Sequence, residues 1–487
     1  MSKDKLYIFD TTLRDGAQTQ GVDFSIDDKL KIAEALDNLG VDYIEGGWPG
    51  ANPTDTEFFQ KKINYKNSLL TAFGMTKKTG RSADNDPGLS ALLNSNTKAV
   101  CIVGKSWDFH VDVALGISNE ENLENISEST KLFIKEKKEF MFDAEHFFDG
   151  YKANPKYTMS CLKAAYDNGA RWIVLCDTNG GTLPHEVSEI VSKVTKIIPG
   201  KNLGIHAHND TENAVANSLA AVLAGARQIQ GTINGLGERC GNANLSSIIP
   251  TLFLKKTFKE KFDLNIKKEN LSLLTECSRF LDEILNKKPN KNMAYVGASA
   301  FSHKGGLHVS AVKKDPRTYE HIDPKLVGNH RNIIISNQSG RSNILSKLEN
   351  YGVKIDSKDP KVQKILDEVK GREFSGYSYD GADASFELLA NKLLGKLPEY
   401  LKVKNYNVNV KKSGSIETTA EVTFIIDGKE IKCTGSGNGP VNALDNAIRS
   451  NFKRVEKYYK YFSDLKLLDY KVRILNTGTG ATTRVLI

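Results

Sequence analysis

Short apolar runs alternate with amphipathic helical patterns from residue 6 to about residue 270, and this alternation restricts the fold more than any other feature. Eight runs have the length and composition of buried strands: LYIFD, YIEGG, SLLTAFG, AVCIVG, EFMFDAE, WIVLCD, LGIHAH and QIQGTI. Eight strand–helix units predict a (β/α)8 TIM barrel, with an open doubly wound sheet as the alternative. An open dinucleotide-binding sheet should carry a Gly-rich turn after its first strand, and DTTLRDGAQ is not one, so we favour the barrel.

The segment between the first two of these strands has the signals of a single helix. Ser25 with Asp28 three residues later is typical of a capping box, and Gly40 stands where a C-terminal cap belongs. Apolar residues recur between them at helical spacing, namely Leu30, Ala33, Leu36 and Leu39. Because LGVDYIEGG then restarts a strand, the sequence predicts a strand–helix–strand unit here.

After the predicted barrel, over residues 1–270, the chain loses this rhythm. We expect residues 271–385 to form a linker region of small helices that contains the Gly/His-rich patch FSHKGGLHVSA. From residue 386 a helical pattern leads into the strand-like segments NYNVNVKK, ETTAEVTFIID and KEIKCTGSG, then a helix from about 441 to 458. Residues 386–487 are therefore predicted to form a separate α+β domain.

Length and composition indicate a multidomain, soluble protein of the cytoplasm. The chain has 487 residues, more than the roughly 250–300 at which single cores stop growing. No run approaches the ~20 apolar residues of a membrane helix, and no signal-type segment follows MSKDK. The six cysteines lie far apart, which favours reduced thiols. The net charge of +8 comes from dispersed lysines, so we expect neither nucleic acid nor a membrane as partner.

Four of the predicted strands end in unusually polar segments: FDTTLRDG, FDAEH, CDTNG and HAHND. In barrels of this kind the working residues lie at the C-terminal strand ends, where the strand-to-helix loops converge. We therefore expect one shared basin lined by the side chains of Arg14, Asp15, Glu145, Thr178, His206 and His208.

The HAHND segment raises the possibility of a metal site. Since side chains alternate along a strand, His206 and His208 point to the same side, as two ligands of one ion require. Asp15 from another strand would complete a mixed nitrogen and oxygen set that suits Mn, Zn, Co or Fe(II) and tolerates Mg. The alternative is a capping or solvated His-x-His pair, which the other polar strand ends make less favourable.

Each remaining candidate also has a structural alternative. Arg14 beside Asp15 is either a surface ion pair or, directly after a buried strand, a clamp for a carboxylate or oxyanion. Glu145 and Asp143 are compatible with solvated carboxylates, and Thr178 with a cap of the following helix. The sequence contains no Walker loop, no G-x-S-x-G elbow and no Cys–His pairing, which argues against phosphoryl transfer and acyl-enzyme chemistry.

Three linked motifs, FDTTLRDGAQ, HAHND and GLGERCGNANL, resemble in this order the signature of the metal-dependent Claisen-condensing enzymes that include isopropylmalate, homocitrate and citramalate synthases. The run from GAQTQG to GGWPGANPTD is most similar to the citramalate synthase branch, because isopropylmalate synthases usually have a phenylalanine-containing segment where GGWPGANP stands. The resemblance covers nearly the whole chain.

The resemblance implies a role for individual residues. It implies that a divalent metal, Mg, Mn or Zn, is held by Asp15, His206, His208 and Asn242. The keto acid would contact Arg14, Gln18 and Thr178, and Glu145 would support the reacting groups. In the linker region, GGLHVSA and YEHIDP match the segments where the family places a histidine and a tyrosine that reach into a neighbouring subunit's site, here His308 and Tyr319.

The implied reaction is the condensation of acetyl-CoA with pyruvate to citramalate and CoA. Two general bases are compatible with the sequence: His308 with Tyr319, or a water activated through Glu145. Within the same reaction type, 2-oxoisovalerate or 2-oxoglutarate could replace pyruvate. Other classes on such a barrel are carbon–carbon lyases, biotin-dependent carboxyltransferases and a regulatory protein on an inactive barrel, and the complete Asp/His/His set argues against the last.

The C-terminal segment, with GSGNGPVNALDNAI, resembles the family's regulatory domain. This resemblance implies a homodimer and an end-product effector, isoleucine. Such chains usually continue for another strand and helix beyond the equivalent of TTRVLI, so the domain is expected to be truncated and its effector site incomplete.

Overall fold

The structure of the chain is a computed structural model that describes residues 3–61, 64–452, 464–467, 470–475 and 478–486. It divides into two compact units. The first comprises Met1–Ser302 and Glu320–Asn332, and the second comprises His303–Tyr319 and Ile333–Ile487.

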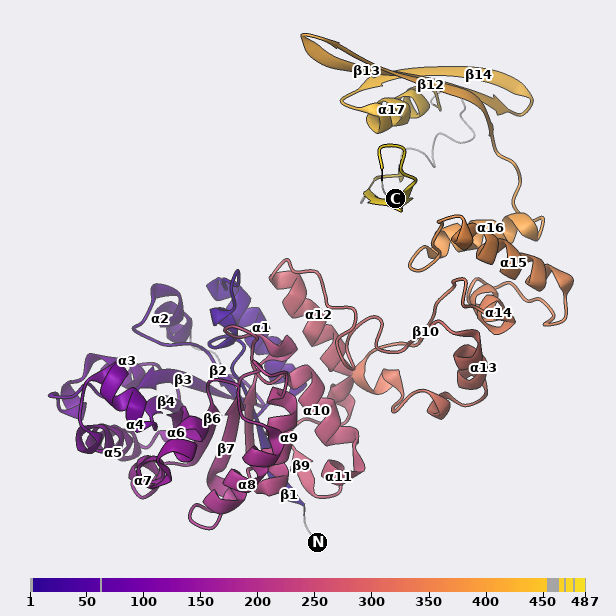
Figure 1. Ribbon diagram of the computed structural model, residues 1–487. Coiled ribbons are helices and arrows are strands. Elements are labelled where there is room, and N and C mark those ends of the chain that lie inside the picture. The colour runs from indigo at the N-terminus through magenta and orange to yellow at the C-terminus, as the bar shows by residue number, and fades with distance from the viewer. Residues whose placement is uncertain (1–2, 62–63, 453–463, 468–469, 476–477, 487) are drawn as a thin grey trace. The chain divides into compact units, whose positions relative to one another are not determined.

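Eight parallel strands form a closed barrel in the first unit (Figure 1). They pair in chain order from β2 to β8, then β8 pairs with β1 and β1 with β2, which closes the ring. The strands are β1 (Asp4–Asp10), β2 (Tyr43–Glu45), β3 (Leu69–Met75), β4 (Ala99–Lys105), β5 (Glu139–Glu145), β6 (Trp172–Asp177), β7 (Leu203–Ala207) and β8 (Gln228–Gly231). Each coincides with one of the eight predicted strands, so the TIM barrel is confirmed.

Helices in the connections surround the barrel. Ser25 and Asp28 form the predicted capping box at the start of the first helix, and Gly40 ends it with a left-handed φ of 98°. The main helices that follow the eight strands are α1 (Ile26–Leu39), α2 (Pro53–Gln60), α3 (Pro87–Leu93), α5 (Asn119–Lys135), α7 (Pro155–Tyr166), α8 (Pro184–Val194), α9 (Ala214–Ala224) and α10 (Leu245–Leu254). Shorter pieces precede two of them, α4 (Asp108–His110) and α6 (Phe147–Ala153).

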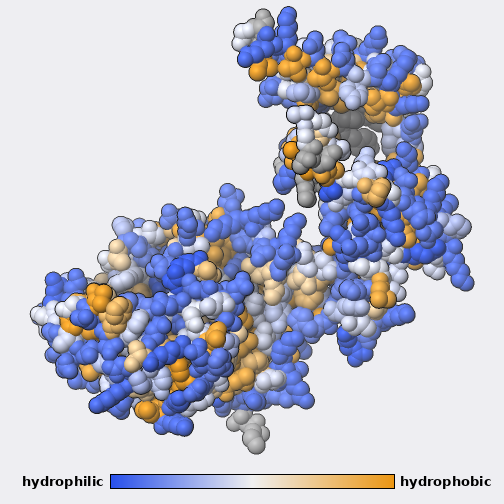
Figure 2. Space-filling view, viewed as in Figure 1, coloured by the Kyte–Doolittle hydropathy of each residue, from blue (hydrophilic) through white to orange (hydrophobic). Residues whose placement is uncertain are grey.

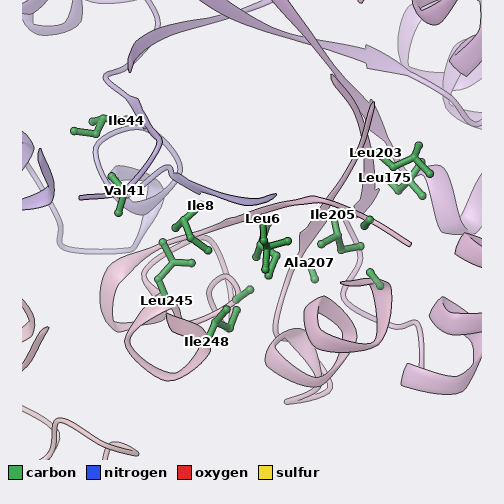
Figure 3. Packing of buried hydrophobic residues seen from close by; sticks show 14 of the residues in the cluster. Leu6, Ile8, Val41, Ile44, Leu175, Leu203, Ile205, Ala207, Leu245 and Ile248 are labelled. Carbon is green, nitrogen blue, oxygen red and sulfur yellow. The ribbon is translucent and has the colours of Figure 1, made fainter. Parts of the chain in front are cut away.

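The alternation of side chains along each strand separates two apolar layers. Leu6 and Ile8 of β1 point outward and belong to the large core between strands and helices, to which α10 contributes Leu245 and Ile248 (Figure 3). The inward-facing residues form a second cluster inside the barrel, with Phe9, Tyr43, Phe73, Ala99, Cys101, Met141, Trp172, Val174 and Cys176. Side chains two residues apart on a strand point to the same side, so Asp143 and Glu145 of β5 face the barrel interior as Met141 does. They lie nearer to the C-terminal ends of the strands, where such barrels carry their sites.

A ninth strand adds to the barrel from the outside. β9 (Phe262–Leu264) pairs in parallel with the first half of β1, in the register Asp4 to Phe262 and Leu6 to Leu264. Along this edge the second half of β1 pairs with β2, at Phe9 and Asp10, whereas β8 pairs with the opposite edge from Tyr7 onward. β9 and β2 therefore share one edge of β1, and β8 occupies the other.

The remaining segments are mainly helical up to residue 393 and then form a separate sheet. The helices are α11 (Lys256–Lys259), α12 (Leu274–Ile284), α13 (Gly306–Lys314), α14 (Arg341–Asn350), α15 (Pro360–Phe374) and α16 (Asp383–Leu393), and a two-stranded sheet joins β10 (Ser302–His303) and β11 (Asn332–Ile333). The helical linker region is thus confirmed, and α14, α15 and α16 share a small core of their own.

The C-terminal segment contains the predicted α+β domain. Its antiparallel sheet joins β12 (Lys402–Ser413), β13 (Ser415–Ile426) and β14 (Lys429–Gly437), and α17 (Pro440–Phe452) packs on it. A hairpin follows with β15 (Lys471–Ile474) and β16 (Thr483–Leu486). The part of the predicted 441–458 helix beyond residue 452 and the final residue of ATTRVLI lie outside the described residues.

The visible face of the barrel is largely hydrophilic, with hydrophobic residues scattered over it (Figure 2). Among the described helices, none combines the length and the apolar character needed to cross a membrane. No disulfide joins the six cysteines, all of which lie in the described part of the chain, and Cys240 is the exposed one.

Candidate active site

The polar strand ends predicted from the sequence line one cavity at the mouth of the barrel. The cavity measures about 330 Å³, near the lower end of the range for small-molecule sites. The predicted residues in its wall are Arg14, Asp15, Gln18, Glu145, Thr178, His206 and His208. All of them belong to the first unit, so the basin expected from the sequence exists within one compact body.

Asp15, His206 and His208 form a buried group whose potential ligand atoms lie within 4.8 Å of one another. Nε2 of His206 lies 3.3 Å from Oδ2 of Asp15 and 3.2 Å from Nε2 of His208. The three residues are 3%, 3% and 7% exposed, which rules out a solvated strand end. Asp15 precedes η1 (Gly16–Gln18) without capping it, so its carboxylate serves no helix end.

The donor set fits a divalent cation. Two imidazole nitrogens 3.2 Å apart repel each other through their lone pairs unless a proton or a cation lies between them. Oδ1 of Asp15 is buried and has no hydrogen-bond partner within the described part of the chain. A buried carboxylate that has one unpartnered oxygen and lies beside two ring nitrogens is the arrangement expected of a metal site whose protein ligands are in place.

The charges of the group reinforce one another. Burial works to raise the pKa of Asp15, but the Arg14 guanidinium and His206 outweigh it and hold this pKa far below its usual range. Burial works to lower the pKa of His206, yet the hydrogen bond and charge of Asp15 raise it. Burial and the neighbouring His206 lower the pKa of His208 to about 3, so its imidazole is neutral near pH 7.

Arg14 is held rigidly at the edge of the same group. Its Nε donates to Glu45 Oε2 over 2.7 Å, its Nη1 lies 3.3 Å from Asp15, and its guanidinium lies 3.8 Å from the ring centre of Phe73. Burial opposes ionisation, but the charges of Glu45 and Asp15 outweigh it and raise the pKa of Arg14. The surface ion pair considered from the sequence is therefore excluded, and a fixed cation faces the cavity.

Thr178 and Glu145 also line the cavity. The hydroxyl of Thr178 accepts a hydrogen bond of 2.8 Å from the backbone N–H of His146, so it does not cap α8, which begins six residues later. Glu145 is half-buried and forms an ion pair with Lys105 from the end of β4. Asp143, in contrast, is buried at 3% exposure, and burial with the charge of Glu45 raises its pKa to about 6.

Comparison with known proteins explains this arrangement. The family model described as HMGL-like matches residues 5–274, the model for a homocitrate synthase post-HMGL domain matches 295–373, and the LeuA allosteric (dimerisation) domain matches 380–487. The chain is 52% identical to the (R)-citramalate synthase of Aquifex aeolicus, over 99% of this chain and 92% of that protein. The chain belongs to the citramalate synthase group of the HMGL-like family. The (R)-citramalate synthase of Geobacter sulfurreducens is 50% identical over 100% of this chain and 92% of its own length.

Solved structures of the HMGL-like family share the barrel. The HMG-CoA lyase of Bacillus subtilis superposes with a TM-score of 0.51, covering 60% of this chain and 98% of the lyase. At 19% sequence identity this likeness concerns the fold alone.

The fourth metal ligand implied by the HMGL-like motif lies next to the group. Asn242 is 2% exposed, and its backbone forms a β-bridge with that of His208. Its Nδ2 donates to the carbonyl of Leu236 over 3.1 Å, whereas Oδ1 has no hydrogen-bond partner among the described residues. Gly237 allows this approach, since a Cβ there would lie 2.2 Å from Nδ2 of Asn242.

Several residues that support this site cannot be identified from the sequence alone. Glu45 and Gln230 lie inside apolar runs whose pattern predicts strand interior, and Lys105 is the last residue of β4. Arg239, in the loop after β8, donates to both carboxylate oxygens of Asp210 and to the carbonyl of Thr178. The alternation of side chains along a strand is the signal that points to Glu45 and Gln230, because it places both side chains in the barrel interior.

The two linker residues of the HMGL-like resemblance lie in the second unit. His308 of α13 stacks on Tyr319, with ring centroids 4.1 Å apart and planes at 28°. Both side chains are exposed, Tyr319 at 45%. The structure therefore brings these two residues together as one exposed pair.

Proposed function

We propose that the protein is an acyltransferase, an (R)-citramalate synthase, which condenses acetyl-CoA with pyruvate and water to citramalate and CoA. This reaction would open the threonine-independent route to isoleucine. The observation that carries the proposal is the buried Asp15, His206 and His208 group beside Arg14 in one cavity. Its support is the identity of 52% and 50% to full-length proteins of that name.

The residues that would hold a divalent cation are Asp15, His206 and His208, with Asn242 beside them. Their mixed nitrogen and oxygen donors suit Zn²⁺ or Mn²⁺ and tolerate Mg²⁺. When bound, such a cation supplies Lewis-acid polarisation of the keto carbonyl.

Arg14 would orient the keto acid and stabilise developing charge. Its Nε donates to Glu45 and its Nη1 faces Asp15, so Nη2 would meet the carboxylate of pyruvate or the keto oxygen as it becomes anionic. Gln18 and Thr178, in the same cavity wall, would complete the polar contacts of this substrate. Because Arg14 is fixed before the substrate arrives, little reorganisation is needed during the reaction.

His308, paired with Tyr319 and contributed by a neighbouring subunit, would act as the general base. It removes a proton from the acetyl methyl group, and the resulting carbanion equivalent forms the new bond to the keto carbon of pyruvate, whose oxygen takes up a proton. Water then adds to the thioester carbonyl and the carbon–sulfur bond breaks, releasing CoA as the thiol. A water activated through Glu145 is the alternative base.

The apolar part of the cavity wall would meet the alkyl group of the keto acid. It consists of Trp48, Phe73, Met75, Val103 and Leu115. Bulky side chains here leave room for a methyl group and disfavour the isopropyl group of 2-oxoisovalerate, a discrimination of roughly 1–3 kcal/mol per methylene.

The test is a thiol-release assay with acetyl-CoA and one keto acid at a time: pyruvate, 2-oxoisovalerate or 2-oxoglutarate, each with and without a chelator. We expect rapid release with pyruvate that the chelator abolishes and that Zn²⁺ or Mn²⁺ restores. Preferential release with 2-oxoisovalerate or 2-oxoglutarate would assign the protein as a 2-isopropylmalate or a homocitrate synthase. No release with any of the three would exclude a synthase and direct attention to a metal-dependent lyase.

The C-terminal residues matched by the LeuA allosteric (dimerisation) domain support two further expectations. The protein would be a homodimer, and an amino acid, isoleucine, would act as effector. Sedimentation of the full chain tests the first, and the thiol-release rate in the presence of isoleucine, with leucine as control, tests the second.

A further inference from the structure

A chain of hydrogen bonds runs from the metal-site group into the interior of the barrel. Nδ1 of His206 lies 2.9 Å from Oε1 of Gln230, and Nε2 of Gln230 donates to Oδ1 of Asp143 over 3.0 Å. Gln230 is fully buried, and the other two are 3% exposed. The three residues come from β7, β8 and β5, so the link crosses the barrel interior.

The donors and acceptors of this chain allow one arrangement. A carboxylate only accepts, so the amide group of Gln230 must face Asp143 and its oxygen must face the imidazole. An amide oxygen also only accepts, so Nδ1 of His206 carries the ring proton. When the imidazole is neutral, its lone pair therefore lies on Nε2, which is the atom that faces Asp15 and His208.

We propose that Gln230 is a positioning residue that holds His206 in the Nδ1–H tautomer, with its Nε2 free as a metal ligand, and that Asp143 fixes the Gln230 amide in the orientation this requires. The inference rests on the proposed metal site. A neighbour that receives the second ring proton commonly raises the basicity of a histidine ligand and fixes its ring plane.

His208 has no hydrogen bond equivalent to the one that Gln230 makes with His206. Nδ1 of His208 is buried and has no hydrogen-bond partner among the described residues. The fold thus orients His206 in advance and leaves His208 to adjust its ring.

A matched control exists two residues earlier on the same face of β8. Gln228 is also fully buried, and its amide lies 3.7 Å from the sulfur of Met141 without touching either histidine. Replacing Gln228 therefore removes an amide of the same size from the same strand and leaves the hydrogen bonds between His206, Gln230 and Asp143 in place.

The first experiment measures Mn²⁺ binding to the metal-stripped, full-length protein by the electron paramagnetic resonance signal of free Mn²⁺. We expect Gln230→Leu to weaken the affinity by roughly 10–100-fold, the usual effect of losing a partner behind a metal ligand. Gln228→Leu should stay within about threefold of the parent. Melting curves of the metal-free proteins report whether each variant is folded.

The second experiment restores the hydrogen bonds with the groups exchanged. In the double variant Gln230→Glu with Asp143→Asn, a carboxylate accepts from His206 and an amide donates to that carboxylate, so both bonds are kept. We expect its Mn²⁺ affinity to lie within about threefold of the parent, well above that of Gln230→Leu.

The outcomes separate the two levels of the proposal. No Mn²⁺ binding by the parent protein would overturn the metal site itself, and the role of Gln230 with it. Binding by the parent that Gln230→Leu leaves unchanged would overturn the role of Gln230 alone. A folded double variant as weak as Gln230→Leu would show that side-chain packing, not the tautomer, is what Gln230 provides.

Discussion

The fully buried carboxylate of Glu45, at the end of β2, accepts a hydrogen bond of 2.7 Å from Nε of Arg14. Arg14 lies in the loop that follows β1, the strand paired with β2. The same oxygen accepts from the hydroxyl of Thr11. One acidic side chain thereby fixes the direction in which the guanidinium points.

We expect Glu45→Gln to lower kcat/KM for pyruvate by about tenfold or more, because removing one charge of a buried pair leaves the other uncompensated. Steady-state thiol release measures the effect. Glu139→Gln is the control, since Glu139 starts β5 at the other end of the barrel and accepts from Tyr43. Equal losses in both variants would mean that the carboxylate of Glu45 serves stability alone.

Asp15→Asn should reduce the affinity for Mn²⁺ by more than the 10–100-fold that is typical of residues behind a ligand, because it removes the anionic donor itself. The reason is the position of Oδ2, 3.3 Å from Nε2 of His206. Titration of the metal-free variant with Mn²⁺ measures the change. An affinity equal to that of the parent would place the cation elsewhere.

Gly241→Ala should distort the loop that carries Asn242. A Cβ on Gly241 would lie 2.0 Å from the carbonyl oxygen of Gly235, and its φ of 92° favours glycine. Strain of this kind costs about 1–3 kcal/mol, so we expect a lower melting temperature together with weaker Mn²⁺ binding. Gly181→Ala, where a Cβ meets no atom within 4 Å, should change neither property.

Asp10→Asn should change how the stability of the barrel depends on pH. Burial, more than any other cause, raises the pKa of Asp10 to about 7, while in the unfolded chain it is near the ordinary value of 3.8. The native state therefore holds a proton that the unfolded state releases, and stability falls as the pH rises from about 4 to 7, by at most about 1.4 kcal/mol per pH unit.

The asparagine variant lacks this ionisation. The difference in melting temperature, variant minus parent, should therefore become more positive between pH 5 and pH 8. Differential scanning calorimetry of both proteins across this range measures the difference. Asp263→Asn, on an exposed position of β9, is the control and should show a difference that does not depend on pH. A constant difference for Asp10→Asn would contradict the raised pKa.

Mixing two inactive variants tests whether His308 acts across the dimer. In a heterodimer of Asp15→Asn with His308→Ala, action across the interface leaves one site intact, and action within the chain leaves none. We therefore expect thiol release to reappear after the two proteins are unfolded and refolded together. Mixed subunits that stay inactive, although parent chains treated in the same way recover, would assign His308 to its own barrel.

The barrel could be predicted from the sequence because its signals are local. Each strand is a short apolar run, and the capping box of Ser25 and Asp28 marks the first helix within four residues. The spacing of His206 and His208 is equally local, since alternation along one strand places both rings on the same side.

The supporting residues of the site could not be predicted in this way. Glu45 reaches Arg14, and Gln230 reaches Asp143, only through the pairing of strands that are far apart in the sequence. A single polar residue in an apolar strand carries no information about its partner on another strand. The relation of His308 to the barrel depends on a second unit, which strand patterns do not address.

The pairing of β1 with the late strand β8 has a consequence for how the protein is made. One edge of β1 pairs with β2 as soon as that strand leaves the ribosome, but the other edge pairs with β8 and has no partner until Gly231 has been synthesised. For more than two hundred codons the nascent chain therefore presents an unpaired strand edge to its surroundings. Its need for chaperone protection should end when translation passes this point, well before the stop codon.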